Sequence, residues 1–96
     1  MNEILIITYD LKNPSFNFET LIQRIKYFGA WAKLGTSAFL IFTSASPTEV
    51  RDYLKEVLTE NDKLFISVIK APAAWFGIGN EVSSWIRDQY TKVRKI

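Results

Sequence analysis

The sequence predicts an α+β fold, with the element order strand, helix, strand, strand, helix, strand and a third helix at the C-terminal end. Two observations support this fold class. Short runs of β-branched and aromatic residues alternate with longer segments whose apolar residues recur at helical spacing. The chain has 96 residues, which is enough for one domain and too few for two separate cores. We therefore expect residues 1–96 to form a single domain.

The first two elements follow from the pattern of apolar residues. Glu3 to Asp10 has the composition of a strand with apolar residues on both faces, which is typical of a strand in the middle of a sheet. A turn is expected around Pro14, because proline disfavours a helical residue before it. Asn17 to Phe28 then carries one apolar stripe at helical spacing, and Gly29 is a residue type that often ends helices.

The middle of the chain predicts two more strands and a helix. Ala30 to Leu34 is a short strand, Gly35 is a turn residue, and Thr36 to Thr43 is a strand with an unbroken apolar run. The segment Ser46-Pro47-Thr48-Glu49 has the pattern of a capping box with proline at the first helical position. The helix that it begins is expected to extend to about Glu60.

The C-terminal third predicts one strand, an aromatic loop and a helix. Lys63 to Lys70 is apolar on both faces and therefore resembles another buried strand. Residues 73–79 contain two aromatic residues and two glycines and are expected to form a loop. Asn80 is expected to cap the last helix. The inward-facing residues of that helix are expected to be Val82, Trp85, Ile86 and Tyr90.

This order of elements is the ferredoxin-like βαββαβ arrangement with an added C-terminal helix. Right-handed crossovers place both inner helices on one face of a four-stranded antiparallel sheet. The strands are apolar on both faces, so the second face needs a cover, either the C-terminal segment, another copy of the chain, or both. We expect a homodimer. The residues expected at its interface are Tyr9, Trp75, Phe76 and Trp85.

Composition excludes several kinds of site. The sequence contains neither cysteine nor histidine, which rules out thiolate and imidazole zinc sites, disulfides and Ser-His-Asp triads. A metal can be held only by oxygen ligands, and these favour ions such as Mg²⁺ or Mn²⁺. No apolar run has the length of a membrane span, and the first residues lack the features of a signal peptide. We therefore expect a cytoplasmic protein that does not enter membranes.

Asp10 is the strongest candidate for chemistry. It ends a central strand, and ligands in open sheets tend to bind beyond the ends of central strands. The start of the fourth strand is expected nearby, which would bring Asp62 within reach. Carboxylates paired within one chain or across a dimer axis could hold a divalent metal that polarises a phosphodiester. The alternative is that Asp10 accepts backbone hydrogen bonds and that Asp62 ends a helix.

Basic and aromatic residues suggest contacts to phosphates and bases. The net charge of +2 permits nucleic-acid binding without requiring it. The candidate phosphate-binding residues are Lys12, Lys33, Arg87, Lys92, Arg94 and Lys95. A solvated helix end, where cations are favoured by the helix dipole, is the simpler explanation of the C-terminal group. Trp31, Trp75 and Trp85 could stack on bases or could belong to the core or an interface, and Tyr9 could be a core residue or a phosphate donor.

Four groups of residues are spaced along the chain in a characteristic order. They are Ile6-Ile7-Thr8-Tyr9-Asp10-Leu11 with Asn13-Pro14, the Ala30-Trp31 step, Thr36-Ser37, and Glu60-Asn61-Asp62-Lys63-Leu64. In this spacing the chain resembles the small Cas2-like proteins, and most closely their stand-alone, SinR-like branch. The likeness covers about residues 3–90.

The resemblance implies a ferredoxin-fold homodimer and a link to CRISPR adaptation and antiviral defence. Some Cas2-like proteins are metal-dependent nucleases in which an aspartate at the end of the first strand meets its symmetry mate, and Asp10 matches that position. The related VapD-type toxins are ribonucleases. The arginine-rich stretch that many Cas2 proteins have before the third strand is replaced here by Trp31 to Gly35, which carries one cation.

Two hypotheses of function follow. The first is a homodimer that binds DNA or RNA and cuts it with an Mg²⁺-type ion held by Asp10, as a nuclease or an adaptation-type component. The second is a non-catalytic interaction module, such as an inhibitor or adaptor that binds a protein of a CRISPR or other defence complex. The weak net charge and the aromatic segment 73–79 favour the second hypothesis.

Overall fold

The computed structural model describes residues 1–94. The strands are β1 (Glu3–Asp10), β2 (Ala30–Gly35), β3 (Ala38–Thr43) and β4 (Lys63–Ile69), and the helices are α1 (Pro14–Lys26), α2 (Pro47–Lys55) and α3 (Asn80–Arg94). One sheet has the order β2-β3-β1-β4, and all neighbouring strands are antiparallel. This is the predicted ferredoxin-like fold with an added C-terminal helix.

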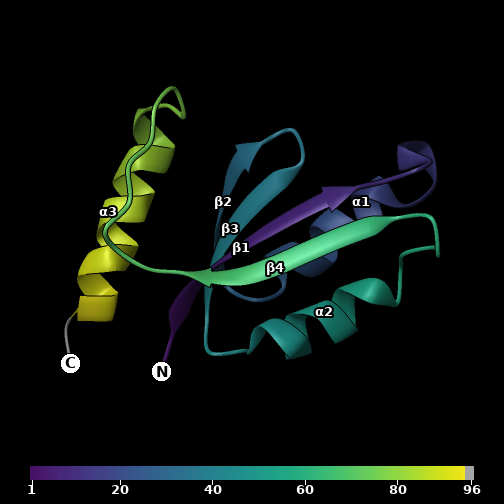
Figure 1. The fold of residues 1–96 in the computed structure, drawn as a ribbon, viewed down its shortest axis with the longest axis horizontal. Coiled ribbons are helices and arrows are strands. Elements are labelled where there is room, and N and C mark those ends of the chain that lie inside the picture. Colours follow the sequence, from purple (N-terminus) through teal and green to yellow (C-terminus); the bar gives the residue numbers. More distant parts are fainter. Residues whose placement is uncertain (95–96) are drawn as a thin grey trace.

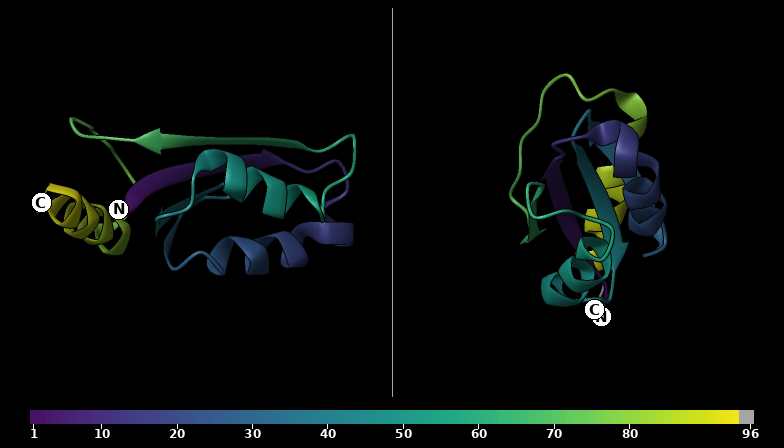
Figure 2. Two further views of the ribbon diagram at one scale, coloured as in Figure 1. Left: turned by 90° about the horizontal axis from the view of Figure 1, so that it is seen from below. Right: turned by 90° about the vertical axis from the view of Figure 1, so that its right-hand side faces the viewer.

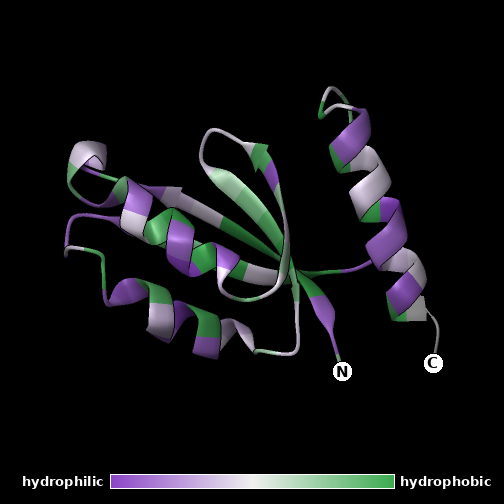
Figure 3. Cartoon of the chain, turned by 180° about the vertical axis from the view of Figure 1, so that it is seen from behind, coloured by the Kyte–Doolittle hydropathy of each residue, from purple (hydrophilic) through white to green (hydrophobic). Residues whose placement is uncertain are grey.

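The main core lies between the sheet and two helices. Alternate side chains of a strand point to opposite faces, so Leu5, Ile7 and Tyr9 of β1 share one face. All three are buried under α1 and α2 together with residues such as Leu21 and Leu54. Both helices lie on the same side of the strands (Figure 2, left). Seen from that side, they alternate hydrophilic and hydrophobic residues along their length (Figure 3), as amphipathic helices on a sheet do.

A second, smaller core lies at one end of the opposite sheet face. Ile4 of β1, Leu40 of β3 and Ile86 of α3 are its buried residues. Helix α3 stands across the end of the sheet where β1 begins, far from the end of β1 at Asp10 (Figure 1). The C-terminal helix therefore covers its own sheet only in part. In the described residues 1–94, no other helix or strand packs on the remainder of this face (Figures 1 and 2).

Helix α1 begins three residues earlier than the sequence indicated. Pro14 is its first residue, rather than part of a preceding turn, and Asn13 before it has a non-helical conformation, with φ −134° and ψ 82°. A proline at this position loses no helical hydrogen bond, because the first backbone N–H groups of a helix have no acceptor. The helix ends at Lys26, and Gly29 then takes a φ of 120°, which leads the chain into β2.

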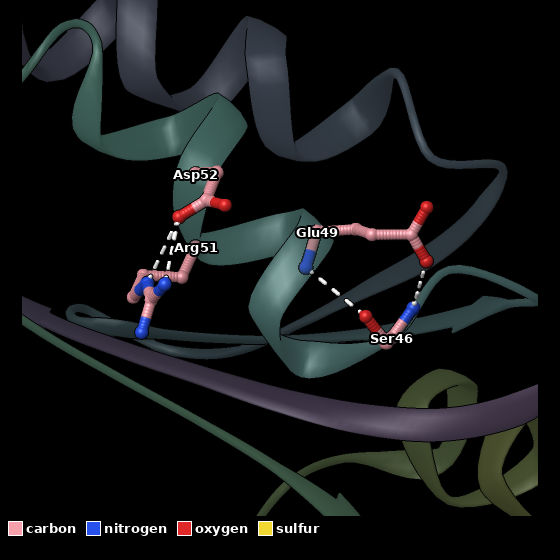
Figure 4. A network of polar contacts seen from close by, with 4 residues as sticks. All are labelled: Ser46, Glu49, Arg51 and Asp52. Atoms are coloured by element: carbon pink, nitrogen blue, oxygen red, sulfur yellow. Dashed lines mark hydrogen bonds and ion pairs between the residues drawn. The ribbon is translucent and has the colours of Figure 1, made fainter.

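The capping box of α2 is confirmed. The backbone N–H of Glu49 donates to the Ser46 hydroxyl at 3.1 Å, and the Ser46 N–H donates to the Glu49 carboxylate at 2.9 Å (Figure 4). The expected end of this helix at Glu60 was wrong, since α2 stops at Lys55. The Val57 carbonyl accepts the amide of Asn17 from α1 instead of continuing the helical ladder.

The remaining differences from the predicted elements are small. Strand β3 begins at Ala38 rather than Thr36, and β4 ends at Ile69. Asn80 is the first residue of α3 rather than its cap. Gly79 precedes it with a φ of 85°, and its carbonyl accepts the N–H of Ser83 at 3.1 Å. A positive φ favours glycine at position 79, and the sequence analysis did not predict this role for Gly79.

Candidate functional site

Asp10 is the last residue of β1 and is exposed. Its direct partner across the antiparallel ladder is Lys63, the first residue of β4. Residues directly opposite each other in a ladder project from the same face, so a carboxylate and an ammonium side chain leave the sheet side by side. Asp10 and Lys63 both line two shallow hollows, one of which also includes Lys12 and Asn61 of the adjoining loops.

The other hollow lies on the part of the sheet that α3 leaves uncovered. We call this part the open face and define it as Thr8, Asp10, Ala38, Lys63, Phe65 and Ser67. The ladder pairs Thr8 with Ala38 on one side and with Phe65 on the other, so these three side chains share the face. The Phe65 side chain is 64% exposed. An apolar centre with charged residues at one rim is therefore accessible to a partner.

The carboxylate of Asp62 stabilises the fold through hydrogen bonds within the chain. Its carboxylate accepts the backbone N–H groups of Lys12 and Thr59, each at 2.8 Å, and the amide of Asn17 at 3.0 Å. These hydrogen bonds, with that of Thr59 the strongest, lower the pKa of Asp62 to about 2. One carboxylate thus joins the turn after β1, helix α1 and the turn before β4. Both oxygens are used within the chain. The alternative that Asp62 ends a helix was wrong, since α2 ends at Lys55.

The donor set for a metal in one chain is small. Within residues 1–94, no three acidic side chains gather at one place. Asp10 offers one exposed carboxylate, and the Asp62 oxygens already accept three N–H groups. Mg²⁺ and Mn²⁺ favour octahedral oxygen coordination and keep several waters, so a single carboxylate per chain fits only a site shared with a second copy or a substrate phosphate.

Tyr9 does not lie on the open face. Its ring is 6% exposed and packs against Phe18 of α1, with the ring centroids 6.4 Å apart. Burial raises the pKa of its hydroxyl, which donates to the Thr36 carbonyl at 3.4 Å. The side chain that was expected at a dimer interface is therefore a core residue, because α1 covers the face to which it points.

The other three expected interface residues lie around α3. Trp75 is half-buried, and its indole N–H donates to the Ser83 hydroxyl at 2.9 Å. Trp85 is half-buried in the second core. Phe76 is 98% exposed. The two tryptophans thus help α3 to cover the end of its own sheet, and Phe76 is left on the surface.

The expected basic residues whose side chains the structure describes do not form one rim. Lys12 lies beside Asp10, and Lys33 is on β2. Arg87 lies 5.6 Å from the Trp75 ring centroid, and the Lys92 ammonium lies 5.9 Å from that of Phe42. These last two belong to α3, at the end of the sheet opposite to Asp10 (Figure 1). Arg94 ends α3, its side chain lies outside the described part of the structure, and Lys95 lies outside the described residues altogether.

Sequence reasoning missed Lys63 and Phe65 as parts of the site. The signal was present, because an antiparallel fourth strand that starts at Lys63 places that residue opposite Asp10. Alternation along the strand then puts Phe65 on the same face. The bond of Asn17 to Asp62 carries no comparable signal, because it depends on how α1 packs beside the loop before β4.

No helix within residues 1–94 has the length and hydropathy needed to cross a membrane. Comparison of the chain with models of protein families, with curated proteins and with solved structures gave no match.

Proposed function

We propose that two copies of this chain associate through the open face and form a nucleic-acid-binding dimer that cleaves phosphodiester bonds with a divalent metal at Asp10. The observation that carries the proposal is the position of Asp10. It is an exposed carboxylate at the rim of a sheet face whose centre, Ala38 and Phe65, is apolar and which the described chain leaves uncovered. The resemblance to Cas2-like proteins agrees with this assignment.

The apolar centre of the open face supports self-association. Apolar patches of several hundred Å² are rarely left in water. The face contains a phenylalanine that is 64% exposed, and the ladder sets it beside Thr8 and Ala38. A two-fold symmetric pair would bury this centre and bring both copies of Asp10 to one interface.

The charged rim supports a phosphate ligand. The Asp10 carboxylates of the two copies would hold Mg²⁺ or Mn²⁺ together with water and a substrate oxygen. Such an ion stabilises charge on the phosphate oxygens and activates water. Lys12 and Lys63 adjoin Asp10 in the same hollow, and their ammonium groups would attract and orient the phosphate backbone. In this proposal the protein acts in the cytoplasm, on DNA or RNA.

The test combines mass and activity measurements on the full chain. Sedimentation velocity should give a dimer. Cleavage of labelled DNA or RNA should require Mg²⁺ or Mn²⁺ and should be lost in Asp10→Asn, which keeps the shape of the side chain. Asp88→Asn, a change of another exposed aspartate on α3, is the matched control. A monomer, or equal cleavage by Asp10→Asn and the parent, would overturn the proposal.

A second candidate function is favoured by the loop before α3. Phe76 is 98% exposed at this loop, and a protruding aromatic residue is a typical anchor for a protein partner. In this case the chain would be a non-catalytic adaptor or inhibitor of a CRISPR or other defence complex. Phe76→Ala would then release a protein recovered with the parent, and no metal would produce cleavage.

A further inference from the structure

A second surface, distant in sequence from the residues around Asp10, combines exposed aromatic and basic side chains. We call it the aromatic–basic surface and define it as Lys26, Tyr27, Trp31 and Lys33. Lys26 is the last residue of α1, and Trp31 and Lys33 belong to β2, an edge strand of the sheet. Tyr27 is 72% exposed and Trp31 is 40% exposed. Both lysines are exposed as well.

The two exposed rings of this surface are held in place by contacts with neighbouring side chains. The Trp31 ring packs on the buried Phe39, with the centroids 5.9 Å apart, and the Lys26 ammonium lies 4.3 Å from the Trp31 centroid. The Tyr27 ring lies 5.2 Å from the Tyr53 ring. Each exposed ring therefore contacts other side chains of the protein and keeps an accessible portion. Supported rings lose little conformational freedom when a flat ligand stacks on them.

The segment of the chain that carries Tyr27 and Trp31 contains basic residues and no acidic ones. Residues 20–48 contain no aspartate or glutamate, and they contain Arg24, Lys26 and Lys33. The Arg24 guanidinium donates to the Glu56 carboxylate at 2.7 Å, which leaves Lys26 and Lys33 as the cations beside the exposed rings. A partner that fits this surface is anionic and presents flat faces.

We infer that the aromatic–basic surface binds single-stranded nucleic acid, with bases stacked on Trp31 and Tyr27 and phosphates beside Lys26 and Lys33. Base stacking on aromatic side chains together with backbone contacts from cations is how proteins bind single strands without reading sequence. Paired bases hide their flat faces in the duplex, so a single strand fits better than a double strand. The inference deepens the proposed function, because it rests on nucleic acid as the ligand and names its form.

The experiment measures binding of the full chain to labelled 12-residue dT and rU oligonucleotides and to a 12-base-pair duplex by fluorescence anisotropy. Trp31→Ala should weaken single-strand binding by about tenfold, within the range expected for one stacked base, and should change duplex binding far less. Trp31→Phe should restore most of the affinity. Tyr27→Ala should also weaken binding, and since that ring is 72% exposed, the variant is expected to keep its fold.

The contribution of Lys26 and Lys33 is tested by measuring how the affinity depends on salt concentration. The double variant Lys26→Gln and Lys33→Gln should lower the slope of log affinity against log salt by about 1.4, at about 0.7 for each single-strand phosphate contact. Lys55→Gln on α2 and Phe16→Ala on α1 are the matched controls and should leave binding unchanged. Equal affinity of Trp31→Ala and the parent, equal losses in the controls, or a preference for duplex would overturn the inference.

The outcomes separate this inference from the proposed function. Binding that depends on Trp31, with no cleavage under any metal, supports the surface and contradicts the nuclease. Cleavage that depends on Asp10, with binding indifferent to Trp31 and Tyr27, contradicts the surface and supports the nuclease. The absence of any oligonucleotide binding contradicts both.

Discussion

Asp10 and Lys63 form the last residue pair of the ladder between β1 and β4, and both line the two hollows at that end of the sheet. The pairing sets the charge beside the candidate metal position. An ammonium opposite the carboxylate favours a bound phosphate and disfavours a bound cation. Changing the sign of the charge at residue 63 should therefore change which ion binds.

Lys63→Glu should create a divalent-metal site that the parent chain lacks when no nucleic acid is present. Two carboxylates directly opposite each other repel, and a shared cation removes that repulsion. Mn²⁺ should raise the Tm of Lys63→Glu well above its effect on the parent, because a ligand present at a hundred times its Kd stabilises the native state by about 2.7 kcal/mol. Lys63→Gln is the control. A Tm of Lys63→Glu that does not respond to Mn²⁺ would contradict the accessibility of Asp10.

Phe65→Glu should separate the proposed dimer without unfolding the chain. Phe65 is 64% exposed in one chain, so the charge costs little there, whereas at a buried interface it would be left unpaired. Sedimentation velocity should then give a monomer whose circular dichroism matches the parent. Phe16→Glu, at another exposed phenylalanine on α1 (71% exposed), should leave the mass unchanged. Loss of the dimer in both variants would show a nonspecific effect of charge.

Local patterns were sufficient for the fold. Strand Glu3–Asp10 has both ends where the sequence placed them, because its apolar run is bounded by polar residues and a turn. The start of α2 was equally clear, since a capping box is a local hydrogen-bonding pattern. Its end was not, because the Val57 carbonyl is engaged by Asn17, a residue 40 positions away. Tertiary hydrogen bonds of this kind leave no periodic trace in the sequence.

The candidate site was only partly predictable, because some of its features follow from local patterns and others depend on tertiary contacts. The position of Asp10 follows from the strand order alone. The environment of Asp62 does not, because its three hydrogen bonds come from two loops and a helix. Of the positions that the sequence left open for Tyr9, the core is the observed one, and the dimer interface was wrong. Side-chain alternation gives the face, whereas the extent of cover depends on where α1 and α3 lie.

Asp62→Asn should make the fold less stable at neutral pH and less sensitive to acid. The pKa of Asp62 is about 2 in the folded chain and 3.8 ordinarily, so the folded state favours the ionised form. Its contribution to stability is present above about pH 4 and is lost as the pH falls through about 2. Denaturant titrations at pH 7 and pH 2.5 should show a difference between variant and parent that shrinks at the lower pH. A difference of equal size at both values would contradict the assigned hydrogen bonds.

Ser46→Ala should lower the free energy of unfolding by about 1 kcal/mol, the usual cost of removing a helix cap. The hydroxyl accepts the Glu49 N–H at 3.1 Å at the first turn of α2, and alanine leaves that group without a partner (Figure 4). Thermal or denaturant unfolding measures the change. Ser44→Ala, at an exposed residue of the same loop, is the control and should cost much less. Equal losses in the two variants would assign the effect to the loop and not to the cap.

Ile86→Ala should release α3 while the sheet stays folded. Ile86 is 4% exposed and packs with Ile4 and Leu40, and this change at a buried site typically costs about 2–5 kcal/mol. Helix α3 meets the sheet at one end and lies apart from α1 and α2 (Figure 1), so the loss should appear as local opening. Amide hydrogen exchange should therefore accelerate in α3 and stay slow in β1 and β3.

Leu54→Ala is the matched comparison, because Leu54 is fully buried in the main core between α2 and the sheet. Removing its side chain should accelerate exchange in β1 and β3 as well, since that core joins both helices to the central strands. If Ile86→Ala instead accelerates exchange in β1 as much as in α3, then α3 and the sheet unfold as one unit. The second core would in that case contribute to global stability, rather than hold one helix in place.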